Sequence, residues 1–225
     1  MVDVAEDVQA IADQMGLGRV GVAGASVGGP AAIAVAAGLP ERVSRVGLVV
    51  APAPIFDRNL DFFAGMDADS RKGYEFVGLD GPELESWLTR DWEETLSFVR
   101  DVLPTLGSTA GFEMLQAAFE EGVRPGPGGL WDDMMALVAE WGFDLTRVRM
   151  PVRLIQADDD TTVPQGHTDW WLRHLPQAEV TYIPGGHIGA RVTRPIGSSE
   201  SWLCSPGSLQ TTPDLSHVVV RSGPE

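Results

Sequence analysis

The segment Arg19-Val-Gly-Val-Ala-Gly-Ala-Ser-Val-Gly-Gly-Pro30 decides the fold of this chain. Residues 19–25 form an apolar run bounded by glycines, which is too short for a helix and typical of a buried strand in a parallel sheet. Residues 27–37 consist mainly of Gly and Ala, and a Gly-Leu-Pro stop signal follows, so they are predicted to form a helix. A second apolar run covers residues 46–51. Strand, helix and strand at this spacing predict a βαβ unit.

The alternation of helices and strands continues on both sides of this unit. Apolar residues recur at three- and four-residue spacings over residues 2–15, which predicts an amphipathic helix. Later in the chain the patterns predict a strand at 152–157, a helix at 164–175 and a strand at 179–183. The sequence therefore predicts an α/β fold with a mostly parallel sheet, whose core is formed by residues 1–56 and 150–190.

Residues 57–149 separate the two halves of the predicted core. Helical patterns occur around residues 82–102, 110–121 and 130–141, and we expect this segment to form a helical lid. Large apolar side chains gather in it, at Trp87, Trp92, Met114, Trp131, Met134, Met135 and Trp141. Packing between helices explains these side chains, and the alternative is an apolar lining for a substrate pocket.

The composition changes after Arg191. Seven of the 13 serines lie between Ser198 and Ser222, prolines are interspersed, and no helical period is sustained. Residues 191–225 are therefore predicted to be an irregular or disordered tail.

Length, charge and cysteine content exclude several classes of protein. The 225 residues with 44% hydrophobic content suit one globular domain. A net charge of -16 disfavours nucleic acid and anionic lipid as partners. A single cysteine, Cys204, provides no disulfide framework, and no apolar run approaches the ~20 residues that span a bilayer. The acidic start of the chain is unlike a signal peptide, so we expect a cytoplasmic protein.

The string Gly24-Ala25-Ser26-Val27-Gly28 is the first candidate for chemistry. The serine lies between a predicted strand and a predicted helix, where a sharp turn would expose its hydroxyl group. Glycines at such a turn let the strand and the helix pass closely. The first N–H groups of the helix point toward whatever Ser26 attacks, so the N–H of Val27 is expected to be an oxyanion donor.

A serine hydroxyl needs a base, and the base needs an acid that orients it. Candidates for both follow predicted strands, at Asp158–Asp160 and at His187. The carboxyl edge of a parallel sheet is where α/β proteins place their ligands. Taken singly, the aspartates are typical of a solvated turn and His187 of a surface loop, but their shared position at strand ends with Ser26 favours a joint role.

These motifs resemble the α/β-hydrolase superfamily, in particular its lidded, serine esterase-like members. The resemblance covers about residues 2–191, and it rests on Gly24–Gly29, Pro40–Val49, Asp159–Pro164 and Gly185–His187. In that family the acid stands four residues before the proline of a G-x-x-D-x-x-V-P motif. Asp160 matches this position, although Ala157 replaces the glycine. The resemblance implies that Ser26 is the nucleophile, Asp160 the acid and His187 the base. Asp158 and Asp159 are fallback acids, and His167, His174 and His217 have no motif in their favour.

A serine at this turn also restricts the reaction. Related epoxide hydrolases and haloalkane dehalogenases place Asp there, so Ser26 favours acyl transfer. We expect a serine hydrolase that acts on a carboxylic ester or a related small-molecule acyl substrate and requires no metal or organic cofactor. The alternatives are a truncated, catalytically impaired hydrolase remnant or interaction protein, and a lyase or cofactor-free peroxidase on the same scaffold.

The resemblance implies a further feature at the start of the chain. Family members carry four strands before the helix predicted here at residues 2–15, and the loop after the third strand supplies a second oxyanion donor. Neither is found in this sequence, which would leave the strand at 19–25 as an unpaired apolar edge. The chain would then be a truncated or frame-shifted hydrolase, or one half of a protein completed by another polypeptide. We expect this edge to be buried by self-association or by a complementing chain, or else the protein to be poorly soluble.

Overall fold

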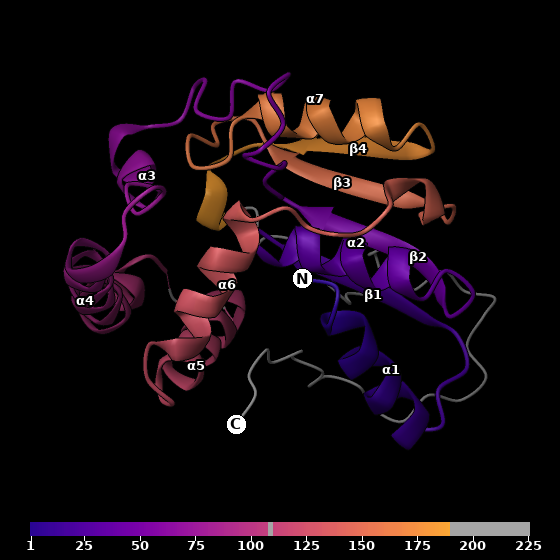
Figure 1. Ribbon diagram of the computed structural model, residues 1–225, viewed down its shortest axis with the longest axis horizontal. Helices are drawn as coiled ribbons and strands as arrows, with labels where there is room; N and C mark the ends of the chain where they lie inside the picture. Colours follow the sequence, from indigo (N-terminus) through magenta and orange to yellow (C-terminus); the bar gives the residue numbers. More distant parts are fainter. Residues whose placement is uncertain (108–109, 190–225) are drawn as a thin grey trace.

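The computed structural model describes residues 1–107 and 110–189. Its α-helices and strands are α1 (Val4–Gln14), β1 (Val20–Ala25), α2 (Gly28–Gly38), β2 (Val43–Val49), α3 (Ala68–Lys72), α4 (Gly81–Ser97), α5 (Ala110–Val123), α6 (Gly128–Val138), β3 (Val152–Ala157), α7 (Gln165–His174) and β4 (Ala178–Ile183). A π-helical turn (Phe98–Val102) follows α4, and 3-10 turns occur at Leu103–Thr105 and Leu145–Arg147. Figure 1 shows their arrangement.

The four strands form one parallel sheet in the order β1-β2-β3-β4. Val22 lies opposite Val46, Leu48 opposite Leu154, and Ile155 opposite Thr181. Parallel neighbours require crossover connections. Helix α2 lies in the crossover between β1 and β2, and α7 in the crossover between β3 and β4. The predicted α/β fold with a mostly parallel sheet is confirmed.

Strand β2 differs from its predicted range at both ends. It begins at Val43, where the sequence predicted a start at Val46, because Val43 already pairs with Val20 of β1. Two half-buried polar residues, Ser44 and Arg45, hid this first part from an apolar pattern. The strand ends at Val49, since Val50 has a φ of 45°, a value that a β-branched residue rarely adopts.

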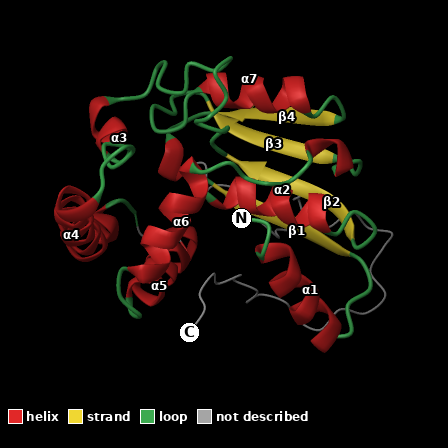
Figure 2. Ribbon diagram, viewed as in Figure 1, coloured by secondary structure: helices red, strands yellow, loops and turns green. Residues whose placement is uncertain are grey.

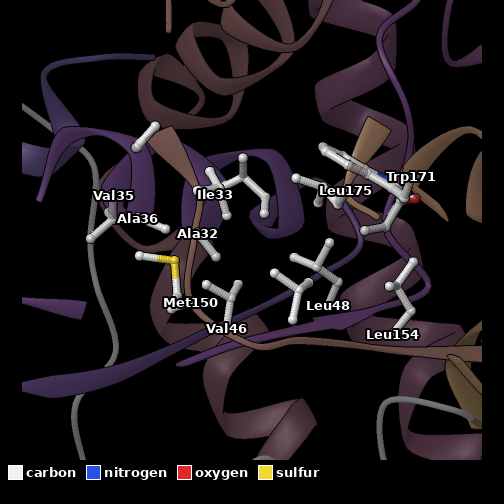
Figure 3. Packing of buried hydrophobic residues seen from close by; sticks show 14 of the residues in the cluster. Ala32, Ile33, Val35, Ala36, Val46, Leu48, Met150, Leu154, Trp171 and Leu175 are labelled. Carbon is white, nitrogen blue, oxygen red and sulfur yellow. Dashed lines mark hydrogen bonds between the residues drawn. The ribbon is translucent and has the colours of Figure 1, made fainter. Parts of the chain in front are cut away.

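The hydrophobic core lies between one face of the sheet and the helices α2 and α7. Helix α2 packs on β1 and β2, and α7 packs on β3 and β4. Figure 3 shows Ile33 of α2 above Val46 and Leu48 of β2, and Trp171 of α7 above Leu154 of β3. Most side chains of α2 are no larger than Val, which allows the close approach of helix and sheet that the sequence predicts.

The helical insertion (residues 57–149) contains α3 to α6, which Figure 2 shows as a group of helices beside one end of the sheet. An aromatic cluster joins both ends of this insertion to α7. Trp141 stacks on Phe143 and on Trp171, each at a centroid distance of 5.6 Å, and Phe56 packs edge-on against Trp141. Trp141 lies in the loop after α6 and is buried in the core cluster, so it packs against the core and not between helices of the insertion.

Two predictions concern the rest of the chain. The predicted irregular tail, residues 191–225, lies outside the described residues. Across the part of the chain that the structure describes, every helix is too short or too polar to cross a membrane.

Candidate active site

Ser26 occupies a sharp turn between β1 and α2. Its φ is 52°, in the left-handed region that non-glycine residues seldom adopt. The N–H of Ser26 donates to the carbonyl of Val49 on β2 (2.9 Å), and its own carbonyl accepts the N–H of Gly29 (2.9 Å). These two bonds hold the residue in its strained conformation, as the sequence predicted for a serine exposed by a strand-to-helix turn.

Two glycines, Gly24 and Gly29, allow this turn. The motif around Ser26 would instead suggest the pair Gly24 and Gly28. A Cβ atom on Gly24 would lie 1.9 Å from the carbonyl oxygen of Gly28, and one on Gly29 would lie 2.3 Å from the Cβ of Ala51. A Cβ atom on Gly28 would meet open space. The close approach of strand and helix therefore depends on Gly24 and Gly29, whereas Gly28 contributes its carbonyl group to the contact.

The three side chains proposed from the sequence meet at the carboxyl ends of β1, β3 and β4. His187 Nε2 lies 3.0 Å from Ser26 Oγ, and His187 Nδ1 lies 2.8 Å from Asp160 Oδ2. A carboxylate can only accept, so Nδ1 carries the proton, and the unprotonated Nε2 accepts the hydroxyl hydrogen of Ser26. The imidazole thus connects a hydroxyl group with a carboxylate.

Asp160 is buried and its orientation is fixed by its own loop. Its side chain is 0% exposed, against 10% for His187. The other carboxylate oxygen, Oδ1, accepts the backbone N–H groups of Thr162 (2.9 Å) and Val163 (2.8 Å). These donors, together with His187 on Oδ2, fix the direction of both carboxylate oxygens.

The fallback acids do not face the imidazole. Asp158 and Asp159 are exposed, and their backbone N–H groups donate to the carbonyls of Ile183 (2.9 Å) and Gly185 (3.1 Å). These two bonds tie the loop that carries Asp160 to the loop that carries His187. The aspartate run is thus a turn, as the simpler interpretation had it, with one member directed inward.

The other histidines have structural surroundings. His167 in α7 is buried, and its Nδ1 accepts the N–H of Ala53 at 3.1 Å. His174, at the end of α7, stacks on the ring of Trp170 with a centroid distance of 3.9 Å. His217 lies outside the described residues.

Val27 follows Ser26 directly and is the residue at the N-terminus of α2. The partial positive charge of a helix N-terminus stabilises negative charge that develops beside it. An oxyanion formed next to Ser26 would therefore lie at a favourable position. No group of three potential metal-ligating side chains occurs within residues 1–107 and 110–189.

Comparison with known proteins identifies the family of this chain. Residues 1–190 match the family described as the alpha/beta hydrolase fold, and the chain belongs to that family. Over 184 residues it is 30% identical to the pimeloyl-[acyl-carrier protein] methyl ester esterase of Nitrosomonas europaea. That match covers 80% of this chain and 68% of the esterase. The family and this similarity establish a hydrolase.

Solved structures share the fold at lower identity. A bromoperoxidase from Bacillus anthracis is 21% identical with a TM-score of 0.57, and the match covers 84% of this chain and 68% of that one. An esterase from a marine microorganism is 17% identical with a TM-score of 0.51, and the match covers 85% and 71%. These similarities support the fold alone.

The sequence patterns gave no signal for one set of contacts beside Asp160. Asp67, at the start of α3 in the helical insertion, is hydrogen-bonded to Thr161 through both its backbone and its side chain. The two residues are 94 positions apart, and although Thr161 lies within the Asp159–Pro164 motif, nothing in that motif indicates a contact with Asp67. Only the folded chain brings them together.

Proposed function

We propose that this protein is a serine hydrolase that cleaves a carboxylic ester with Ser26, His187 and Asp160 as its catalytic residues. The observation that carries the proposal is the pair of contacts made by His187, 3.0 Å to Ser26 and 2.8 Å to Asp160. Membership of the alpha/beta hydrolase family and similarity to a methyl ester esterase support the same reaction.

In the first half of the reaction, Ser26 Oγ attacks the carbonyl carbon of the ester. His187 Nε2 accepts the hydroxyl proton as the new C–O bond forms, and the buried Asp160 stabilises the resulting imidazolium. The N–H of Val27 donates to the oxyanion of the tetrahedral intermediate. The intermediate then collapses, the bond to the alcohol breaks, and His187 gives its proton to the departing alkoxide.

In the second half, water releases the acyl group from Ser26. His187 Nε2 accepts a proton from the water molecule, the hydroxide attacks the acyl-enzyme carbonyl, and a second tetrahedral intermediate forms. Its collapse returns the proton to Ser26 Oγ. The products are one alcohol and one carboxylic acid, and the side chains regain their starting protonation states.

The charge of the helical insertion favours a neutral acyl group. Residues 57–149 contain 19 acidic and 8 basic residues, so they carry most of the net charge of -16. Such a concentration of negative charge repels anionic ligands and lowers their local concentration. We therefore propose a small uncharged ester as the substrate, and not an acyl group carried on an acidic protein.

The test uses a short-chain 4-nitrophenyl ester and a fluorophosphonate probe that labels activated serines. Ser26→Ala should abolish labelling and reduce ester turnover by about 10⁴-fold or more, because the members of such a triad act as a unit. Ser44→Ala is the matched control, since the hydroxyl of Ser44 donates to the carbonyl of Val20 in the sheet, away from His187. It should retain labelling and turnover.

The outcomes separate the two principal interpretations. Turnover within a few-fold of the parent in Ser26→Ala would contradict the covalent mechanism. A folded parent that neither reacts with the probe nor hydrolyses esters would favour a catalytically impaired remnant. For the substrate class, kcat/KM should be higher for a neutral ester than for its anionic carboxylate analogue, and added salt should narrow the difference.

A further inference from the structure

We propose that Asp67 and Thr161 are positioning residues, which hold the loop of residues 160–164 so that the Asp160 carboxylate faces His187. This loop is called the acid loop below, and the hydrogen bonds that join it to the helical insertion are called the latch. The inference rests on the serine hydrolase function proposed above. According to this inference, the helical insertion helps to hold the Asp160 carboxylate in place.

The latch consists of three hydrogen bonds between the start of α3 and the acid loop. The N–H of Asp67 donates to the carbonyl of Thr161 at 3.0 Å. The hydroxyl of Thr161 donates back to Asp67 Oδ2 at 2.8 Å. The hydroxyls of Ser70 and Thr162 lie 3.2 Å apart and form the third bond. Backbone and side chain of Asp67 thus hold the same residue of the acid loop.

Asp67 is itself held in place and charged. Its Oδ1 accepts the N–H of Ser70 (2.8 Å), as an N-cap of α3, and its Oδ2 also accepts the Ser70 hydroxyl (2.9 Å). The backbone N–H of Ser70, and after it the hydroxyl of Thr161, lower the pKa of the Asp67 carboxyl group. Asp67 is therefore an acceptor with a fixed direction at neutral pH.

Thr161 stands between Asp160 and the two residues that orient its carboxylate. Asp160 Oδ1 depends on the N–H groups of Thr162 and Val163, so its direction follows the backbone of the acid loop. A rotation of the peptide groups around Thr161 would move those donors and swing Oδ2 away from His187. The latch opposes that rotation from the side of the helical insertion.

The other side of the acid loop is already fixed. The N–H groups of Asp158 and Asp159 bind the carbonyls of Ile183 and Gly185, near His187. At the far end, a Cβ atom on Gly65 would lie 3.3 Å from the Cβ of Pro164, so the helical insertion packs closely against the loop there as well. The hydroxyl bond between Thr161 and Asp67 can be removed by a nearly isosteric substitution of Thr161.

The test compares Thr161→Val, which removes the hydroxyl donor, with Thr161→Ser, which keeps it. The matched control is Thr146→Val. The hydroxyl of Thr146 also donates to an N-cap aspartate, Asp144 (2.7 Å), but outside the acid loop. Thr161→Val should reduce kcat and the rate of fluorophosphonate labelling about tenfold with KM nearly unchanged. Thr161→Ser should recover the parent rates within about twofold, and Thr146→Val should match the parent.

Hydrogen exchange provides a readout that does not depend on activity. The amides of Thr162 and Val163 should exchange faster in Thr161→Val than in the parent, and no faster in Thr146→Val. Parent-like labelling and kcat in Thr161→Val, or a Thr161→Ser variant as slow as Thr161→Val, would overturn the positioning role. If the parent itself is inactive, the proposed function fails, and hydrogen exchange alone tests the latch. Unchanged protection of the Thr162 and Val163 amides in Thr161→Val would then overturn the latch.

Discussion

His167 is predicted to make the stability of this protein depend on pH. The imidazole is 2% exposed, its Nδ1 accepts the N–H of Ala53, and the ring of Phe62 packs edge-on against it at 4.7 Å. Protonation of Nδ1 would break the bond to Ala53 and place a charge in the core. Burial accordingly lowers the pKa of His167 to about 4 from its usual 6.5.

The direction and size of the effect follow from this pKa. Between about pH 6.5 and 4 the unfolded chain binds a proton at His167 that the folded protein does not, so stability falls as the pH decreases through this range. With a folded pKa of about 4, the loss is about 2 kcal/mol at pH 5, and it is small above pH 7.

Urea unfolding followed by tryptophan fluorescence measures this difference at pH 7.5 and pH 5. The comparison is His167→Asn, whose Oδ1 can accept the N–H of Ala53 without titrating. The acidic residues titrate in both proteins and cancel in the difference. The parent should lose about 2 kcal/mol more than the variant between the two pH values. Equal losses in the two proteins would show that the folded protein accommodates a charged His167.

Two further predictions concern β1 and the turn that follows it. Gly24→Ala should lower the free energy of unfolding by about 3 kcal/mol or more, because its Cβ would overlap the carbonyl of Gly28. Gly28→Ala should be neutral or slightly stabilising in the same thermal unfolding experiment, because a Cβ there meets open space. Equal effects of the two substitutions would refute the assignment of the close contact. Among the described residues β1 pairs with β2 alone, and Val20 and Ser26 donate their N–H groups to that side. By alternation the N–H of Ala23 points to the open edge, so Ala23→Pro should abolish a concentration-dependent association of the parent in sedimentation velocity without unfolding it. A parent that remains monomeric at all concentrations would contradict association through β1.

Strand periodicity and strand ends made most of the fold predictable. The predicted positions of β1, β3 and β4 agree with the structure within one residue, because their apolar runs are bounded by Gly, Pro or Asp. The first residues of β2 could not be predicted from an apolar pattern, since Ser44 and Arg45 interrupt it. A parallel partner, and not local composition, extends that strand to Val43.

The candidate site divides in the same way. Ser26, Asp160 and His187 could be proposed because each follows a strand, and parallel strands bring their carboxyl ends to one edge. The roles of Gly28 and Gly29 could not be distinguished, because the distinction depends on the distance to Ala51. The contact between Asp67 and Thr161 could not be predicted either, since nothing in the Asp159–Pro164 motif points to an aspartate 94 positions earlier.

The aromatic cluster around Trp141 has a consequence for the order of folding. Strands β2 and β3 are neighbours in the sheet, yet the whole helical insertion lies between them in sequence. Closing a loop of about 100 residues costs about 4 kcal/mol in chain entropy, whereas β1 with β2 and β3 with β4 are joined by short crossovers. The two halves of the sheet should therefore form first as separate units and join late. Trp141 stacks on Phe143 and on Trp171, which brings the end of the insertion to α7. The near-ultraviolet circular dichroism of this aromatic cluster would therefore report the step in which the two halves join.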